Sequence, residues 1–423
     1  MRILILGGYG FIGLEATRAL MAAGHDVAAL GRHSAFGERV LAGARWIEAD
    51  IARLDTPEKW APLLAGVDVV VNASGALQDS ALDNLEAVQD RAIRALVAAC
   101  ERTDVKSFVQ ISAPGADAAS ATGFLRTKAA ADAALKASAL TWVILRPGLV
   151  WGRTAAGGTA LVRMLSAFPL IQPLVLAEAR VQMVDIDDVA AAIVAAVAGD
   201  IAAGADIDLV EPATRTLADI VEQVRAWHGF APAAARIEIA RAIGGLIARL
   251  ADLAGWLGWR SPLRTTSLRA LEQGVIGDAS GWPMATFRES LKRRPATRQD
   301  RLFARMQLLL PLAVLTLSAF WIASGLIGLA RSEAAGAVLA GRIEHAANLV
   351  LIGALADIAL GLALLWRPWA RAACFGMIAL TGAYLVAGTL LTPHLWADPL
   401  GPLVKTLPAA LLALVCAALL EER

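Results

Sequence analysis

Three glycines near the start of the chain have the spacing of a phosphate-binding turn. Gly7, Gly10 and Gly13 follow an apolar run at residues 2–6 and precede a helical pattern at residues 14–23. Glycines in such a turn let the backbone approach a pyrophosphate closely, and the next helix points its amino terminus at the anion. We therefore predict a dinucleotide site at Gly7, Gly10, Phe11, Ile12 and Gly13.

Short apolar segments that alternate with helical patterns must position this turn. Strands are predicted at residues 2–6, 26–30, 45–47, 68–72, 107–111 and 141–145, separated by helices that include 82–101 and 123–138. This alternation predicts an α/β fold, a Rossmann-type doubly wound parallel sheet that binds ligand beyond the carboxyl ends of its strands. The residues at those ends are Gly7, Arg32, Asp50, Ala73, Ser74, Gly75, Ser112, Pro147 and Gly148.

Arg32 and His33, which follow the second strand, bear on the choice of cofactor. A site selective for NAD usually has a carboxylate here to hold the ribose 2′-hydroxyl, whereas a guanidinium suits the 2′-phosphate of NADP. The first acidic residue after this strand is Glu38. The pattern favours NADP(H), with NAD(H) and a merely solvated arginine as the alternatives.

Motifs over residues 1–200 resemble the atypical short-chain dehydrogenase/reductase superfamily, in the NAD(P)H-binding branch that includes NmrA-like proteins and a complex I subunit. They occur in the expected order, at residues 7–13, 49–51, 72–75, 111–113, 124–128, 146–152 and 181–190. The resemblance implies that Asp50 and Ile51 contact the adenine, and that Ala73, Ser74 and Gly75 contact the ribose beside the nicotinamide. The predicted cofactor-binding set also contains Arg32, His33, Lys128 and Pro147.

One departure from this superfamily bears directly on catalysis. The superfamily's proton donor is the tyrosine of Tyr-x-x-x-Lys, but here Phe124 stands four residues before Lys128. Tyr9 and Tyr384 are the two tyrosines of the chain, and neither precedes a lysine at that spacing. Phenylalanine cannot transfer a proton, so carbonyl reduction by this pair is excluded. Lys128 and Ser112 are the candidate catalytic residues, the alternatives being an exposed helix lysine and a turn residue.

The last part of the chain has a different composition. Only 12 of the 77 charged residues lie at positions 306–423, which indicates a segment built for lipid. Apolar stretches at residues 307–330, 346–366, 372–391 and 402–420 are each long enough to cross about 30 Å of hydrocarbon. We predict an all-α bundle of four transmembrane helices, which resembles a DoxX-like domain, with the lipid bilayer as a partner.

Basic residues predict the orientation of this bundle. Six lie in residues 292–305 before the first span, and Arg367 and Arg371 separate the second span from the third. On the other side, Arg331 and Arg342 are balanced by two glutamates. Because Lys and Arg favour the cytoplasmic side, we expect both termini there and the protein in the cytoplasmic (inner) membrane. The first residues do not form a signal peptide, so we expect the cofactor domain in the cytoplasm.

Two segments of the first part of the chain admit more than one interpretation. Asp185, Asp187 and Asp188 precede a helical pattern, where carboxylates cap a helix, although Asp188 is also a catalytic candidate. The segment 241–259 repeats apolar residues at helical spacing. It would cover the cofactor cleft, lie on the membrane surface or form a plain core helix.

Asp357 is an ionisable residue within the second predicted span. Gly353 and Gly361 flank it at spacings of four, so we expect this face to pack against another helix rather than lipid. His345, Asn348 and Lys405 are its predicted partners in a structural hydrogen bond. The alternative is a quinone site or a proton-linked site.

Together these features predict two domains and leave three functions open. Residues 1–300 form the NAD(P)-binding domain, with about 205–300 as its substrate-side lobe, and residues 301–423 form the membrane domain. The first function is an oxidoreductase acting on a lipid-soluble acceptor such as a quinone. The second is a non-catalytic NAD(P)-binding scaffold or redox sensor of a membrane complex, and the third is an epimerase or dehydratase. A net charge of +1 and dispersed Cys and His residues predict no nucleic-acid partner and no metal site.

Overall fold

The computed structural model describes residues 1–423 apart from 77, 78, 80–83, 260, 340–343, 400 and 421–423. Arg342 and the first two residues of the predicted helix 82–101 therefore lie outside the described residues. The chain divides into two compact units. The first contains Met1–Leu253 and Ser261–Ala304, and the second contains Ala254–Arg260 and Arg305–Arg423.

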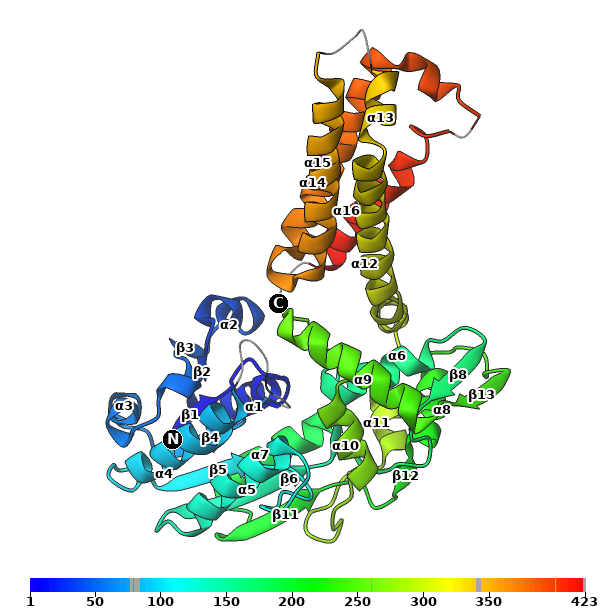
Figure 1. Ribbon diagram of the computed structural model, residues 1–423. Helices are drawn as coiled ribbons and strands as arrows, with labels where there is room; N and C mark the ends of the chain where they lie inside the picture. Colours follow the sequence, from blue (N-terminus) through cyan, green and yellow to red (C-terminus); the bar gives the residue numbers. More distant parts are fainter. Residues whose placement is uncertain (77–78, 80–83, 260, 340–343, 400, 421–423) are drawn as a thin grey trace. The chain divides into compact units, whose positions relative to one another are not determined.

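A seven-stranded sheet organises the first unit (Figure 1). The strand order is β11-β6-β5-β4-β1-β2-β3, and all neighbours are parallel. The strands are β1 (Arg2–Leu6), β2 (Asp26–Gly31), β3 (Arg45–Glu48), β4 (Val69–Asn72), β5 (Ser107–Ile111), β6 (Thr141–Pro147) and β11 (Ala205–Leu209). The predicted Rossmann-type sheet is confirmed. Its order reverses between β1 and β4, which is where such sheets bind their ligands.

Both faces of the sheet are covered by helices because its strands are apolar on both sides. In β1, Ile3 and Ile5 pack into one core and Leu4 and Leu6 into the other, as the alternation of strand side chains requires. One core includes residues of α1 and α7, and the other includes residues of α4 and α5. The helices of this sheet are α1 (Phe11–Ala22), α2 (Ser34–Val40), α3 (Pro57–Trp60), α4 (Ala92–Cys100), α5 (Gly123–Lys136) and α7 (Ile186–Ala198), with short turns η1 (Ile51–Arg53), η2 (Ala61–Leu63) and η3 (Ala87–Arg91).

A smaller lobe forms a separate core around Trp151 and Phe287. It draws on residues from 149 onward, whereas residues 205–209, predicted to belong to this lobe, extend the main sheet as β11. Its elements are β7 (Leu149–Trp151), α6 (Gly157–Ser166), β8 (Ile171–Leu174), β9 (Arg180–Val181), β10 (Met183–Asp185), β12 (Arg215–Thr216), α8 (Leu217–Trp227), β13 (Ala235–Glu238), α10 (Thr265–Gln273) and α11 (Phe287–Arg293).

The aspartates at 185–188 hold the start of α7. Asp185 is the N-cap, and its side chain accepts a hydrogen bond from the Asp187 N–H. The same carboxylate pairs with Arg294 at 2.7 Å, and Asp188 pairs with Arg293 at 2.6 Å. The capping interpretation is therefore confirmed, and these groups connect α7 to the last residue of α11 and the residue after it.

The helix α9 (Arg241–Trp256) carries an apolar stripe on its surface. Its members are between 54% and 62% exposed, which rules out the plain core helix. They are Ile243, Leu246, Leu250, Leu253 and Trp256. Within the second unit, the residues that follow α9 attach to the turn between two long helices. Trp259 Nε1 donates to the Leu365 carbonyl at 2.7 Å, and the Arg367 N–H donates to the Leu257 carbonyl at 2.9 Å.

The second unit is a helical bundle. Its helices are α12 (Arg298–Ala330), α13 (Ser332–Val338), α14 (Ala346–Leu365), α15 (Arg367–Leu391), η4 (Pro393–Trp396) and α16 (Thr406–Leu419). Of the described helices, α12, α14 and α15 are long and apolar enough to cross a membrane. The fourth predicted span appears as α16, which has 14 residues. At about 1.5 Å per residue it is shorter than the hydrocarbon layer.

Small residues bring α12 and α14 close together. A Cβ on Gly325 would lie 2.4 Å from the Ala354 carbonyl oxygen, so only glycine fits there. Ser318 Oγ donates across the same contact to the Gly361 carbonyl at 2.8 Å. Asp357 also bonds between helices, as predicted, but its partners are Ser324 and Tyr384 rather than His345, Asn348 or Lys405. The prediction missed them because Ser324 and Tyr384 lie on α12 and α15, far from Asp357 in sequence.

Candidate active site

The glycine turn between β1 and α1 has the shape that a pyrophosphate requires. Gly7 has φ +71°, and its N–H and that of Gly8 donate to the Leu30 carbonyl at 3.0 and 3.2 Å. The Gly10 N–H closes the turn on the Gly7 carbonyl at 2.7 Å. A Cβ on Gly13 would lie 2.0 Å from that carbonyl oxygen. No side chain caps the first turn of α1 at Gly10, so its N–H groups are available to an anion.

Tyr9 packs beside this turn, and the sequence motifs gave it no role in the site. Its hydroxyl accepts the Arg32 N–H at 2.9 Å, and its ring lies 5.7 Å from Phe36 and 6.1 Å from Trp46. A Cβ on Gly31 would meet the Tyr9 ring at 2.1 Å. Tyr9 therefore joins the glycine turn to the end of β2, where the adenosine half of a dinucleotide would lie. Its position between Gly8 and Gly10 was the available signal.

The end of β2 combines a guanidinium with a carboxylate from the neighbouring strand. Arg32 is half-buried and His33 is exposed, as the residue before α2. The Glu48 carboxylate accepts hydrogen bonds from the Ser34 N–H and Oγ at 3.1 and 2.9 Å, and these bonds lower the pKa of Glu48. Glu48 was not predictable as the acid at this site, because the pairing of β2 with β3, and not its place in the sequence, brings it there.

The Arg32→Asp variant is expected to weaken NADPH binding by about tenfold or more, and NADH binding much less. If Arg32 contacts the 2′-phosphate, the substitution turns a charge-assisted contact into a repulsion. Isothermal titration calorimetry of both nucleotides checks this, with Arg102→Asp, which changes an exposed arginine after α4, as the matched control. Equal losses for both nucleotides would remove the argument for NADP.

Asp50 and Ile51 occupy the turn after β3. Asp50 caps η1, accepting the Ala52 N–H at 3.1 Å, and Ile51 is buried in the core beneath it. The Asp50 side chain thus has a structural task, and a contact with adenine remains a prediction. Pro147, another predicted cofactor contact, is buried at the end of β6. The ring of Phe11 packs against Gly152, where a Cβ would lie 3.1 Å from it.

Lys128 is brought to the ends of β4 and β5. Its Nζ donates to the Ser74 carbonyl at 3.1 Å and to the Ile111 carbonyl at 2.8 Å, and the residue is 5% exposed. A Cβ on Gly75 would lie 3.4 Å from the same Nζ. The exposed-helix alternative is therefore wrong. Ala73, Ser74 and Gly75 line the same strand end, with Ser74 Oγ donating to Asn72 at 2.5 Å.

Burial lowers the pKa of Lys128 to about 8, against the smaller opposing effect of the Asp132 carboxylate. The side chain thus carries its charge below pH 8 and loses it above. If the ammonium holds the cofactor ribose, NADPH affinity falls as the pH rises through about 8. Fluorescence titrations from about pH 6.5 to 9.5 measure this. The Lys128→Met variant should show no such fall, whereas Lys136→Met, which changes an exposed lysine on the same helix, should retain it. A fall that persists in Lys128→Met would assign the titration to another group.

Ser112 lies in a buried network rather than in a plain turn. Its Oγ donates to Asp132 at 2.6 Å and accepts from Arg146 at 3.2 Å. Arg146 also pairs with Asp132 at 2.9 Å and with Asp206 at 2.6 Å. Burial raises the pKa of Asp132, against the lowering effects of Arg146 and Ser112. The network fixes α5, and so Lys128, against β5 and β6. A direct catalytic role of Ser112 remains a prediction.

Phe124 lies in the first turn of α5, one helical turn before Lys128. The helix begins at Gly123 because Thr122 caps it, accepting the Leu125 N–H. The two tyrosines of the chain lie elsewhere: Tyr9 is in the glycine turn and Tyr384 is in the other unit. Neither is on α5, where the superfamily has its proton donor. In the part of the chain that the structure describes, no three His, Cys, Asp or Glu side chains are placed to hold a metal ion.

Two families match different parts of this chain. Residues 7–200 match the NAD(P)H-binding family, and residues 318–414 match the DoxX-like family. The two resemblances drawn from the motifs are confirmed at this level: the chain joins a segment similar to the NAD(P)H-binding family to a segment similar to the DoxX-like family.

Curated relatives match the first of these domains. A ceramide reductase of Caulobacter vibrioides is 25% identical over 195 residues, which cover 46% of this chain and 60% of the relative. A 2-alkyl-3-oxoalkanoate reductase of Stenotrophomonas maltophilia is 30% identical over 174 residues, 36% of this chain and 52% of the relative. The chain thus spans between half and three fifths of the length of these proteins.

Solved structures with a similar sheet include two UDP-glucose 4-epimerases. That of Thermus thermophilus, in complex with NAD, is 22% identical with a TM-score of 0.45, covering 65% of this chain and 100% of its own. That of Thermotoga maritima, with UDP-glucose, is 16% identical with a TM-score of 0.48, covering 73% and 97%.

Proposed function

We propose that this chain, with its NAD(P)H-binding domain and its DoxX-like domain, is a membrane-bound oxidoreductase that reduces a quinone dissolved in the bilayer. The observation that carries the proposal is a site that keeps the glycine turn and the buried Lys128 but has Phe124 at the proton donor's position. The glycine turn fits a dinucleotide, because its close backbone packing has no room for a side chain: a Cβ at Gly13 would collide with the Gly7 carbonyl oxygen. When bound, the nicotinamide supplies a hydride.

The missing phenol favours a quinone over a simple ketone on chemical grounds. Hydride addition to a ketone leaves an alkoxide, a strong base that needs an adjacent acid. Hydride addition to a quinone leaves a phenolate, whose conjugate acid has a pKa near that of tyrosine, about 10. One proton from water then completes the hydroquinone. Phe124 thus removes a group that ketone reduction needs and quinone reduction does not.

Lys128 and its surroundings supply what this reaction still requires. The ammonium lies between two strand-end carbonyls, where it can hold the ribose hydroxyls beside the nicotinamide. Its positive charge also stabilises the negative charge that develops on the quinone oxygen. The Ser112–Asp132–Arg146 network holds α5 so that Lys128 keeps this position.

The membrane location rests on the composition of the bundle and on α9. We propose four spans with both ends of the chain on the cytoplasmic side of the inner membrane, as the basic segments at 292–305 and 367–371 favour. The helix α16 is too short to cross the hydrocarbon layer alone, so the apolar residues that flank it would complete the fourth span. The exposed apolar stripe of α9 suits the boundary between headgroups and acyl chains.

The names of the two relatives favour a second candidate, reduction of a lipid that carries an oxo group. Such a reaction would need another proton donor, and the buried Lys128 ammonium, with a pKa of about 8, is a suitable one. A non-catalytic NAD(P) sensor is the third possibility.

Steady-state NADPH oxidation by the full-length protein in lipid nanodiscs separates the three. The acceptors are decylubiquinone and methyl 3-oxododecanoate. We expect the quinone to be reduced faster by about 10² or more, the contribution of a well-placed acid. Faster reduction of the oxoester would support the second candidate. Tight NADPH binding without oxidation by either acceptor would overturn the proposal in favour of a sensor.

A further inference from the structure

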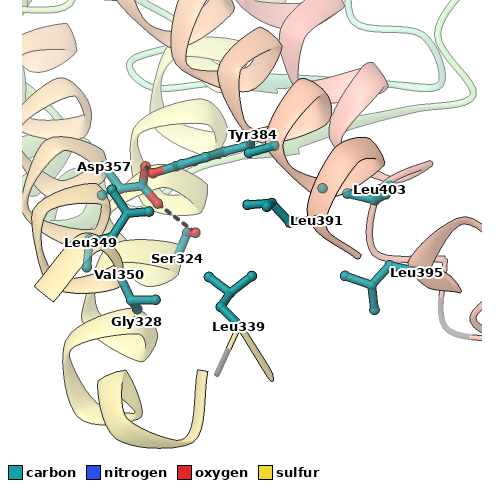
Figure 2. A pocket seen from close by; sticks show the side chains of 14 residues that line it. Ser324, Gly328, Leu339, Leu349, Val350, Asp357, Tyr384, Leu391, Leu395 and Leu403 are labelled. Atoms are coloured by element: carbon teal, nitrogen blue, oxygen red, sulfur yellow. Dashed lines mark hydrogen bonds between the residues drawn. The ribbon is translucent and has the colours of Figure 1, made fainter. Parts of the chain in front are cut away.

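A cavity of about 330 Å³ lies within the bundle of the second unit (Figure 2). This volume is at the lower end of the range for small-molecule sites. The cavity lies among α12, α14 and α15, and leucines from the adjoining segments also line it. Most of its lining is aliphatic, including Leu339, Leu349, Val350, Leu391 and Leu403.

One carboxylate supplies the polar part of this cavity. Asp357 is 5% exposed, and Figure 2 shows its carboxylate between Ser324 and Tyr384. Ser324 Oγ donates to Oδ2 at 3.0 Å, and the Tyr384 hydroxyl donates to Oδ1 at 2.8 Å. Each carboxylate oxygen has two lone pairs, so each retains acceptor capacity after these bonds. Because both hydroxyls donate to Asp357, the polar group in the cavity is an acceptor.

Glycines make room for this arrangement. A Cβ on Gly353 would lie 2.9 Å from the Tyr384 hydroxyl, and a Cβ on Gly388 would lie 2.7 Å from the Leu403 side chain. Gly328 also lines the cavity, where a Cβ would lie 3.0 Å from that of Ala354. The phenol reaches the carboxylate only because position 353 has no side chain.

The cavity belongs to one half of the bundle. Ser324 is 19 residues beyond Arg305 on the continuous helix α12, or about 28 Å along its axis. Asp357 lies near the middle of α14, 9 residues before the connection to α15 at Trp366, and the lining residue Leu391 is the last residue of α15, away from that connection. With the orientation proposed above, this is the outer half of the bilayer.

We infer that this cavity binds a membrane-soluble amphiphile whose hydroxyl group donates a hydrogen bond to Asp357. The aliphatic lining accommodates an apolar chain or ring, and the remaining acceptor sites of the carboxylate select a donor over a bare carbonyl. A buried acceptor left without a donor loses free energy, so ligands that differ only in this donor are distinguished. The inference concerns the bundle alone and stands whether or not NADPH is oxidised.

Binding of a matched redox pair to the full-length protein in lipid nanodiscs tests it. Decylubiquinol and decylubiquinone have the same tail, but only the quinol carries hydroxyl donors. By microscale thermophoresis without NADPH, we expect the quinol to bind about tenfold more tightly than the quinone. The Asp357→Asn variant should lose this preference, and Ala387→Phe, which fills the cavity but keeps Asp357, should weaken both ligands.

Thr381→Val is the matched control, because the Thr381 hydroxyl donates within its own helix, to the Met377 carbonyl. It should bind both ligands as the native protein does. Equal affinities for quinol and quinone, or native binding in Ala387→Phe, would overturn the inference. Displacement of the quinol by 1-dodecanol would assign the site to long-chain alcohols in general. Failure of dodecanol to displace it would restrict the site to aromatic diols.

Discussion

The Gly10→Val variant is expected to lose dinucleotide binding by about 10² or more, while the first unit stays folded. Gly10 has an extended backbone with φ −66°, which valine tolerates, so no positive φ requires glycine there. A Cβ at position 10 would lie 2.9 Å from the Gly7 carbonyl oxygen, so a valine side chain would crowd the glycine turn itself. That is the surface a pyrophosphate must approach.

Calorimetry with NADPH measures the loss, and circular dichroism shows that the fold is kept. Gly245→Val is the matched control, because a Cβ at Gly245 on α9 meets no atom within 4 Å. The control should bind NADPH as the native protein does. Undiminished binding in Gly10→Val would mean that the dinucleotide lies elsewhere.

The Phe124→Tyr variant is expected to gain reduction of simple aldehydes and ketones that the native protein lacks. The substitution adds a phenol one helical turn before Lys128 without changing the ring. Lys128, whose Nζ is already buried at the strand ends, would lower the phenol's pKa as an adjacent positive charge does. A well-placed acid contributes about 10²–10⁴ in rate, which would be visible above background.

NADPH oxidation with a panel of aldehydes measures this gain. Phe168→Tyr, which adds a hydroxyl to another phenylalanine of the same unit, is the control and should stay inactive. Robust carbonyl reduction by the native protein, lost in Lys128→Ala but indifferent to position 124, would show that another residue donates the proton.

The sheet was predictable because both of its faces are buried, so that runs such as residues 2–6 and 141–145 contain little besides apolar residues. Gly7, Gly10 and Gly13 were predictable as a turn because local backbone sterics fix their type. The smaller lobe was predicted less well. Its strands have two to four residues, and their pairing, such as β12 with β9, joins distant segments.

The contacts that could not be predicted join residues that only the tertiary fold brings together. Glu48 reaches Ser34 through the pairing of β2 with β3, and Ser112 meets Asp132 and Arg146 across α5 and β6. Asp357 was recognisable as exceptional from its apolar surroundings, but its contacts with Ser324 and Tyr384 depend on how three helices pack. The periodicity of a sequence predicts which face of a helix such a residue occupies, but not which residues of other helices pack against that face.

Single-turnover oxidation of NADPH deuterated at C4 tests the central claim most directly. The full-length protein in nanodiscs is mixed with decylubiquinone and with either the 4R or the 4S deuterated cofactor. The account predicts oxidation that saturates with quinone, a primary isotope effect for one of the two forms, and no oxidation by Gly10→Val. Oxidation by the native protein no faster than that by Gly10→Val would contradict it.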